Sequence, residues 1–394
     1  MAGREADRQV RTNVAGMHRR PRLAGTTAAL IGVVALAALT VACGTRASTS
    51  PSRSAAVAAA GAAPAAQSAG TITETGSSLL YPLAKAWAAA YHQQFPAVTV
   101  TTASTGSGKG IAAASAGKAD IGASDAYLSS GDLVKNPTLL NIPLTVSAQT
   151  VIYNLPGLSA RSHVNLNGAL LARIYDGTVT TWNDPAIAGL NPGLHLPAIK
   201  IVPIHRSDSS GDTFLFTSYL STQDQQWDNT IGYGTTAAWP RVPGALAEKG
   251  SLDTMHACQA TRGCVAYNGI SYLSQALAGG LGEAALANSV GRFTLPTAGA
   301  IQDSVGSFTS LTPPNETISM INGPGASGYP IINYEYAVVS TRQPSAGQAS
   351  AIRAFLRWVI TTGNAASYLT PGGFQPLPAA LVSLGEEQIA EIGS

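Results

Sequence analysis

The sequence predicts an α/β fold with two lobes. Between residues 71 and 125 the chain repeats a strand followed by a Gly/Ser or Ser-Asp turn, and two of these turns lead into a helix. Three such units in 55 residues are typical of an α/β layer that carries its turns along one edge. A later strand-like run, residues 331–340, leads into a helix without a further repeat. This return of the chain predicts two lobes joined by more than one crossing, with the turn residues collected in the cleft between them.

The elements are expected in the following order. Strands are indicated by alternating or continuous apolar residues, and helices by apolar residues three or four positions apart. The expected strands are residues 72–74, 98–101, 119–125, 142–153, 201–204, 264–267 and 331–340. The expected helices are residues 82–91, 111–117, 170–175, 213–220 and 349–361, with a turn at 182–185 that opens a short helix. We expect the helix 349–361 to be the last one.

The composition excludes several classes of partner. Charged residues make up 11% of the 394 residues, against roughly 25% in ordinary soluble domains. The first 42 residues contain six Arg and two acidic residues, which leaves 17 basic and 19 acidic side chains in the rest of the chain. Such a chain has no electrostatic footprint for nucleic acid or for anionic lipid.

The N-terminus has the pattern of an export signal. A basic segment, residues 18–22, precedes an uncharged apolar stretch, residues 28–41, that is short for a membrane span. Residues 40–43 (Thr-Val-Ala-Cys) resemble a bacterial lipobox, in which the Cys is diacylated and becomes the mature N-terminus. We therefore predict a signal peptide over residues 1–42 and a lipid anchor on Cys43. An ordinary secretory signal with an incidental Cys is the alternative.

Residues 43–70 are rich in Ala, Ser, Pro and Gly and show no periodic pattern, so they are predicted to form a flexible tether. With the lipid anchor, this tether predicts an exported protein held at the outer face of the cell membrane.

Cys258 and Cys264 have five residues between them. In an exported protein such a pair predicts a disulfide that closes a small loop. A metal site is the alternative, but only His256 stands nearby as a further ligand.

Four turns offer the same chemistry. Each places hydroxyl groups or Gly beside an expected helix start, where backbone N–H groups have no partner. The turns are residues 76–79, 106–108, 124–125 and 206–212. Each turn alone is typical of a helix cap. Together with Arg206 and Asp125 they predict a site for a dehydrated tetrahedral oxyanion. A carboxylate that accepts the anion's proton favours phosphate over fully ionised sulfate.

These four stretches, in this order and spacing, resemble the substrate-binding protein of the phosphate-specific ABC importer, especially its actinobacterial lipoprotein forms. The resemblance extends from about residue 71 to 388 and includes residues 123–125, 174–177 with Trp182, and 204–219. It implies a periplasmic-binding-protein fold of type II-like form, with a hinge of two chain crossings and the ligand cleft between the lobes. It also implies a monomeric, non-enzymatic protein without a cofactor, whose partners are phosphate and the permease and ATPase subunits of an ABC importer.

On this resemblance the chain would cross the hinge near residues 143–149 and 329–333. One lobe would then comprise residues 71–146 and 332–394, and the other would comprise residues 147–331. Open lobes would capture phosphate, close over it and dock on the permease.

The resemblance also assigns roles to single positions. Asp125 matches the carboxylate that accepts the phosphate proton, and Arg206, held in place by Asp208, matches the arginine that pairs with phosphate oxygens. Leu79 stands where the family usually has an aromatic residue and would contribute its backbone N–H. The remaining positions would donate hydroxyl or N–H groups. The implied phosphate site comprises Ser78, Leu79, Ser107, Asp125, Arg206, Asp208, Ser210, Gly211 and Asp212.

Asp212 departs from the family pattern, in which many members have Thr. Its backbone N–H can still donate, but a hydroxyl donor is lost and a negative charge is gained. Its carboxylate either turns away as a helix cap or accepts a proton and biases the site toward monobasic phosphate. We favour the cap.

Other function classes are less well supported. Ser107 and Lys109 have the residue types of a nucleophile pair, but their spacing after a glycine turn predicts a hydroxyl donor and a solvated lysine. Residues 106–110 lack the first Gly of a nucleotide-binding P-loop and its Ser/Thr after the Lys. A phosphatase-like enzyme would need metal ligands or a nucleophile that the sequence does not offer. A binding protein for sulfate or molybdate, and a surface antigen or signalling role without transport, stay open.

Overall fold

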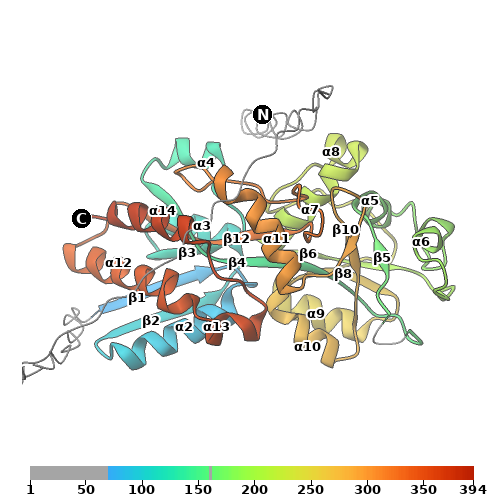
Figure 1. Ribbon diagram of the computed structural model, residues 1–394, viewed down its shortest axis with the longest axis horizontal. Coiled ribbons are helices and arrows are strands. Elements are labelled where there is room, and N and C mark those ends of the chain that lie inside the picture. Colours follow the sequence, from blue (N-terminus) through green and yellow to red (C-terminus); the bar gives the residue numbers. More distant parts are fainter. Residues whose placement is uncertain (1–69, 159–161) are drawn as a thin grey trace, which may run out of the picture. The chain divides into compact units, whose positions relative to one another are not determined.

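The computed structural model describes residues 70–158 and 162–394 (Figure 1). The predicted signal peptide, the lipidation site Cys43 and the predicted tether up to residue 69 lie outside the described residues. Within the described ranges, no helix combines the length and the apolar character that a membrane crossing needs. The same ranges contain no group of three or more His, Cys, Asp or Glu side chains placed to hold a metal ion.

A nine-stranded mixed sheet runs through the described part of the chain, in the order β2-β1-β3-β12-β4-β8-β6-β7, with β9 paired to β4. Its strands are β1 (Gly70–Gly76), β2 (Val98–Ser104), β3 (Ile121–Ser124), β4 (Leu139–Tyr153), β6 (Val202–Arg206), β7 (Leu246–Glu248), β8 (Cys264–Gly269), β9 (Gly282–Glu283) and β12 (Ile332–Ser340). A second sheet has three short strands, β5 (Asn165–Leu166), β10 (Ala285–Ala287) and β11 (Phe293–Thr294).

The strand β4 belongs to both ends of the large sheet. Its residues 139–148 pair with β12, and its residues 149–153 pair with β8. We call β2, β1, β3 and β12 the first half-sheet, and β8, β6, β7 and β9 the second half-sheet. In the first half-sheet β1 is parallel to β2 and β3, and in the second β6 is parallel to β7 and β8. Figure 1 shows β4 and β12 side by side through the middle of the fold.

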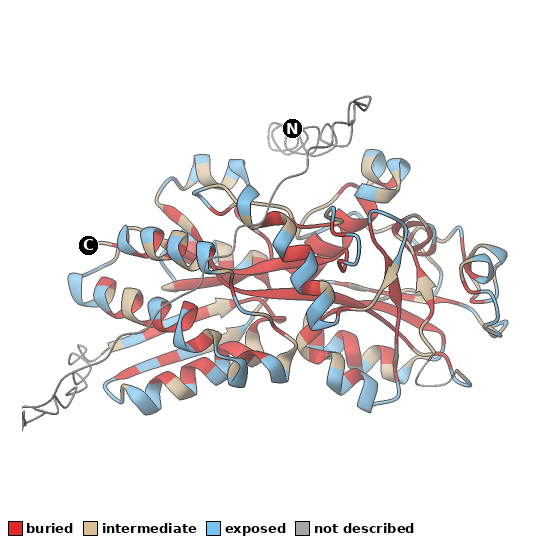
Figure 2. Ribbon diagram, in the orientation of Figure 1, coloured by how far each residue is buried: buried red, intermediate tan, exposed pale blue. Residues whose placement is uncertain are grey.

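Helices cover the faces of the sheet, with buried residues toward the sheet and exposed residues on their outer sides (Figure 2). The α-helices are α2 (Tyr81–Gln94), α3 (Ser107–Ser115), α4 (Ser130–Lys135), α5 (Gly168–Tyr175), α6 (Pro185–Leu190), α7 (Gly211–Gln223), α8 (Gln225–Thr230), α9 (Gly250–Ala260), α10 (Leu273–Ala278), α11 (Ala298–Phe308), α12 (Ala346–Ile360), α13 (Ala366–Leu369) and α14 (Ala379–Ala390). Short 3-10 turns occupy Ile270–Tyr272, Thr309–Leu311, Thr362–Asn364 and Thr370–Gly372.

Most of the predicted elements are confirmed. In α2, for example, Leu83, Trp87 and Tyr91 recur every four residues and are buried together against the sheet. Two expectations are wrong. The helix predicted for residues 349–361 is not the last, because α13 and α14 follow it. The helix α3 begins at Ser107 rather than at 111, so the second Gly/Ser turn forms the first turn of the helix itself.

The predicted cysteine pair is joined in the structure. Cys258 lies in α9 and Cys264 begins β8, and the disulfide between them brings their Cα atoms to 5.4 Å. It fixes the end of α9 to the edge of the second half-sheet, two turns of helix away from the N-terminal residues of α9 that take part in the site described below.

Glu74 is a buried acid in apolar surroundings of the first half-sheet. It is 8% exposed and lines a small cavity with Leu80, Trp87 and Phe355. Its Oε2 atom has no hydrogen-bond partner among the described residues. Burial raises the pKa of Glu74 to about 8, against a smaller lowering by a backbone hydrogen bond.

This raised pKa predicts a pH-dependent stability. The folded state keeps a proton that the unfolded chain loses near pH 4.5, so the stabilisation is complete below that pH and is lost as the pH rises toward about 8. The Glu74→Gln variant does not titrate. Its free energy of unfolding relative to wild type should rise by about 3–5 kcal/mol between pH 4.5 and pH 8.5. Urea unfolding at both pH values measures this, with the exposed Glu391→Gln as the matched control. A difference that is the same at both pH values would contradict the prediction.

Candidate oxyanion-binding site

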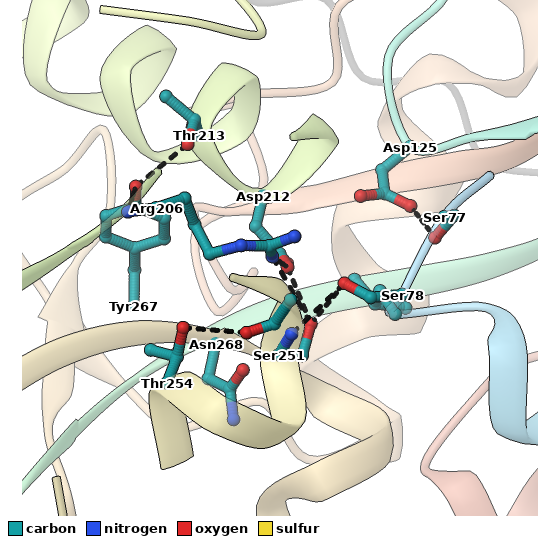
Figure 3. Close-up of polar contacts among 12 residues, drawn as sticks. Ser77, Ser78, Asp125, Arg206, Asp212, Thr213, Ser251, Thr254, Tyr267 and Asn268 are labelled. Carbon is teal, nitrogen blue, oxygen red and sulfur yellow. Dashed lines mark hydrogen bonds and ion pairs between the residues drawn. The ribbon is translucent and has the colours of Figure 1, made fainter. Parts of the chain in front are cut away.

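The structure brings the four predicted turns together where the two half-sheets adjoin. Ser78, after β1, lies with its hydroxyl 2.8 Å from the hydroxyl of Ser251 at the start of α9 (Figure 3). The N–H of Gly108 donates to the carbonyl of Ser209 at 3.1 Å. The carboxyl group of Asp125 packs so closely against Gly211 that a Cβ there would overlap it. Residues from all four turns therefore line one place in the fold.

Strand topology explains this convergence. The strands β1 and β3 are parallel neighbours, so the turns that follow Gly76 and Ser124 leave the same edge of the sheet. Gly76 has a φ of +146°, and a Cβ on it would collide with the backbone of Ala123, so only glycine fits here. On the other side, β6 ends at Arg206 and α7 starts at Gly211. The hydroxyl of Tyr267 fixes this turn, because it accepts the Arg206 N–H at 2.9 Å.

Several backbone N–H groups at this place find no acceptor within the described ranges. Those at the first turns of α3 and α7 have no intrahelical partner, as at any helix start. The N–H groups concerned are those of Ser78, Leu79, Ser107, Gly211 and Asp212. The buried hydroxyl of Ser210 also lacks a partner among the described residues, whereas its N–H donates to the carbonyl of Thr235. Buried donors without acceptors are costly, so this cluster calls for an anionic ligand.

Arg206 is held by two carboxylates. Its Nε and Nη2 atoms donate to Asp208 at 2.7 and 2.6 Å, and its Nη1 atom donates to Asp212 at 2.5 Å. The residue is 3% exposed. Burial alone would lower the pKa of Arg206, but Asp212 and Asp208 raise it above its ordinary value. The positive charge of Arg206 is thus balanced inside the protein before any ligand arrives.

Asp208 holds Arg206 as the resemblance implied. It takes both bonds of the guanidinium fork and accepts the N–H of Gly250 at 3.2 Å. Burial alone would raise the pKa of Asp208, but the hydrogen bonds and the charge of Arg206 outweigh it, so the pKa lies below its ordinary value. Asp208 therefore stays ionised and fixes the position of the Arg206 guanidinium.

Asp212 does not cap its helix, so the favoured expectation for this residue is wrong. The N-cap of α7 is Ser210. The Asp212 carboxylate instead accepts from Arg206, from the Ser251 hydroxyl at 2.8 Å and from the Gln149 amide at 3.1 Å (Figure 3). A local capping preference is worth about 1 kcal/mol, less than a buried charge-assisted bond to a guanidinium.

Asp125 is the other acid of the site and is 1% exposed. Its Oδ1 atom accepts a short bond from the Ser77 hydroxyl, and its N–H donates to the Ser107 hydroxyl at 3.2 Å. Its Oδ2 atom has no partner in the described part of the chain. Burial, and then the negative charges of Glu335 and Asp212, raise the pKa of Asp125 well above its ordinary range. A carboxyl group in this position is ready to exchange a hydrogen bond with a protonated anion.

The structure adds four residues to the site that were not among the predicted ligand positions: Ser77, which lies in the predicted turn 76–79, and Gln149, Ser251 and Tyr267. Ser251 follows Gly250 at the start of α9, which is the same Gly-Ser signal as in the other turns. Gln149 and Tyr267 lie in buried strands, where only the fold brings them near Arg206. The Ser107 and Lys109 pair does not form a nucleophilic couple, because Ser107 is buried and Lys109 is exposed.

A family model of the PBP superfamily domain matches residues 61–362 of the chain. The phosphate-binding protein PstS of Xylella fastidiosa (strain Temecula1) is 32% identical over 311 residues, which cover 79% of this chain and 82% of that protein. PstS of Methanocaldococcus jannaschii is also 32% identical, over 337 residues that cover 80% and 84% of the two chains.

Solved structures show the same fold. The phosphate-bound structure of the high-affinity periplasmic phosphate-binding protein PfluDING has a TM-score of 0.63 and 22% identity, and the match covers 82% of this chain and 99% of that one. A phosphate-binding protein from Stenotrophomonas maltophilia also has a TM-score of 0.63, with 21% identity and coverages of 81% and 93%. The two-lobed α/β architecture predicted from the sequence is confirmed.

Proposed function

Since the chain belongs to the PstS family of phosphate-binding proteins within the PBP superfamily, we propose that it binds inorganic phosphate outside the cytoplasm and delivers it to an ABC permease. The observation that carries this proposal is the cluster of buried N–H donors without acceptors beside the carboxyl group of Asp125. Donors on several sides and one acid suit an oxyanion that still carries a proton. The chain is a binding protein rather than an enzyme, as its relatives are.

In this proposal, backbone N–H groups donate hydrogen bonds to the negatively charged oxygens of phosphate. The donors would come from Ser78, Leu79, Ser107, Ser210 and the first turn of α7, with the helix starts of α3 and α7 adding their positive ends. The phosphate hydroxyl would donate to Asp125. Arg206 would contribute its remaining N–H donors, while Asp208 and Asp212 keep its charge balanced.

We further propose that each half-sheet is the core of one lobe. The lobes would comprise residues 71–146 with 332–394, and 147–331, with hinges near residues 143–149 and 329–333. The crossing of β4 from β12 to β8 falls at this first hinge. The bonds from Ser78 to Ser251 and from Gly108 to Ser209 then join the two lobes across the cleft, as expected of a closed form.

A lipid on Cys43 would hold the monomer beside the permease and ATPase subunits.

Isothermal titration of the phosphate-free protein tests this function. We expect tight 1:1 binding of phosphate and an affinity for sulfate that is lower by about 100-fold or more. Sulfate carries no proton to donate to the Asp125 oxygen, so no hydrogen bond offsets the repulsion between them. Equal affinity for sulfate would remove the role of Asp125. Absence of phosphate binding, or turnover of a chromogenic phosphate ester with divalent metals, would contradict the proposed function.

The Asp212→Thr variant tests the second acid. The Asp212 carboxylate is buried beside Arg206 at the start of α7, so in this proposal a second phosphate hydroxyl can donate to it in the wild type and monobasic phosphate is favoured. Threonine restores a hydroxyl donor and removes this preference. We expect the affinity of wild type relative to Asp212→Thr to fall by about tenfold per pH unit over the alkaline range, the slope of one proton.

The readout is the ratio of the two dissociation constants between pH 6 and pH 9. Asp253→Thr, on an exposed face of α9, is the control and should leave the ratio to wild type constant. A constant ratio for Asp212→Thr as well would mean that Asp212 serves only to hold Arg206.

A further inference from the structure

A second buried acid, Glu335, lies opposite Asp125. In the antiparallel pairing of β12 with β3, Tyr336 stands opposite Ser124. Continued by one residue beyond the end of β3, this register brings Glu335 opposite Asp125, and the two carboxyl groups interact directly. Opposed side chains of an antiparallel pair stand on the same face, with Cβ atoms about 4.5–5.5 Å apart. Glu335 is 0% and Asp125 is 1% exposed, so both carboxyl groups are removed from water.

Each acid has one anchored oxygen and one unfilled oxygen. The Oε1 atom of Glu335 accepts from the Ser147 hydroxyl at 2.6 Å and from the Asn333 amide at 3.0 Å. The same amide donates to the Asp125 carbonyl at 3.2 Å, which ties the two residues together. The Oε2 atom of Glu335 and the Oδ2 atom of Asp125 have no donor among the described residues. One proton between the two carboxyl groups would satisfy both.

Among the residues that the structure describes, the surroundings of the pair provide no unpaired positive charge in place of that proton. The charged or titratable side chains on the elements around Glu335 are Asp125, Asp212 with its partner Arg206, Tyr153 on β4, Tyr334 and Tyr336 on β12, and the exposed Lys109 and Asp303. Asp212 is itself an acid, and Arg206 is already balanced by two carboxylates. Burial raises the pKa of Glu335, and the charge of Asp212 adds to it. Two buried carboxylates at this separation cannot both ionise at neutral pH.

Building on the proposed phosphate site, we propose that Glu335 is a positioning residue that shares one proton with Asp125 and keeps it when Asp125 accepts the phosphate hydroxyl. The pair then carries one negative charge instead of two while an anion binds beside it. The proton also leaves Asp125 with a donor on its Glu335 side, so its other lone pairs face Ser77 and the ligand. At alkaline pH the free pair loses this proton and repels the anion.

The Glu335→Gln variant tests the proposal. The glutamine has the same shape and donates an N–H to Asp125 at every pH. We expect dissociation constants for phosphate within about threefold of wild type at pH 6–7. As the pH rises above the ionisation of the pair, wild type should weaken relative to the variant by about tenfold per pH unit. The titration of phosphate itself cancels in this ratio.

Two further variants separate positioning from structure. Glu316→Gln changes another fully buried acid, whose pKa burial raises to about 9 and whose partner is Gln388, and it should leave the pH profile of wild type unchanged. Glu335→Leu removes the donor and should bind phosphate more weakly than Glu335→Gln at every pH. If Glu316→Gln shifts the profile as Glu335→Gln does, the effect is not specific to the acid pair and the proposal fails.

Wild type alone provides a second measurement. Calorimetry in buffers of different ionisation enthalpy counts the protons bound with phosphate. At alkaline pH wild type should take up one proton more than phosphate's own titration explains. If this uptake is absent, or if the ratio of Glu335→Gln to wild type stays constant from pH 6 to pH 10, the role of Glu335 is disproved. Both results leave the proposed function intact, since both are read from a wild-type protein that still binds phosphate.

Discussion

Replacing Arg206 by methionine should both destabilise the protein and abolish phosphate binding. The side chains of Asp208 and Asp212 are 6% and 1% exposed, and Arg206 is the cation that both contact. Breaking a buried ion pair by removing one partner costs about 3–5 kcal/mol, because a charge is left uncompensated. The Arg206→Met variant leaves two such carboxylates beside the anion site. Affinity for phosphate should therefore fall by at least about 10³-fold, beyond what the lost stability explains.

The matched control is Arg357→Met. Arg357 pairs with Glu386 on the surface, and their side chains are 44% and 38% exposed. Such a pair contributes less than about 1 kcal/mol, so this variant should unfold almost like wild type and bind phosphate normally. Urea unfolding in phosphate-free buffer and calorimetric titration give the two readouts. Equal stability of the two variants would show that the carboxylates escape to solvent or take up protons at little cost.

The Gly211→Ala variant should lose phosphate affinity by about 10²-fold or more while its stability without ligand stays close to that of wild type. A Cβ at this position would lie 2.6 Å from the Cγ atom of Asp125. Gly211 and Asp125 come from the two different half-sheets, so the overlap arises only when the proposed lobes close. The backbone of Gly211 itself accepts alanine, because its φ is not in the left-handed region.

Gly306→Ala, inside α11, is the matched control, since nothing lies within 4 Å of a Cβ placed there. That substitution should leave phosphate binding unchanged and raise stability by about 0.5–1 kcal/mol. Small-angle scattering adds a direct readout, because wild type should contract on adding phosphate and Gly211→Ala should not. A Gly211→Ala protein that contracts and binds normally would mean that Asp125 moves aside, and the close approach would carry no function.

Local signals were sufficient for much of the fold. The spacing of Leu83, Trp87 and Tyr91 predicts α2, because those side chains meet on one helix face. The turn at Arg206 was recognisable because a strand, a Ser/Gly run and a helix follow one another within a few residues. For this part of the site, neighbours in sequence are also neighbours in space.

The rest of the site depends on contacts between distant segments. Gln149 and Glu335 lie in strands whose composition resembles any buried strand. Only the pairing of β4 with β8 and of β12 with β3 places them beside Asp212 and Asp125. The expectation for Asp212 also failed. Its position in a helix's first turn favours a cap, but its carboxylate binds Arg206 together with the distant Ser251 and Gln149.

The internal neutralisation of Arg206 bears on where such a protein can work. A binding protein that attracts its anion with a net positive charge binds it more slowly as the ionic strength rises, because salt screens that charge. Here the guanidinium is outnumbered by the carboxylates of Asp208 and Asp212, so the attraction for the anion comes from short-range N–H dipoles shielded from the medium. The rate at which phosphate binds should then depend little on ionic strength. Diffusion and the shape of the site would set this rate, rather than long-range electrostatic attraction.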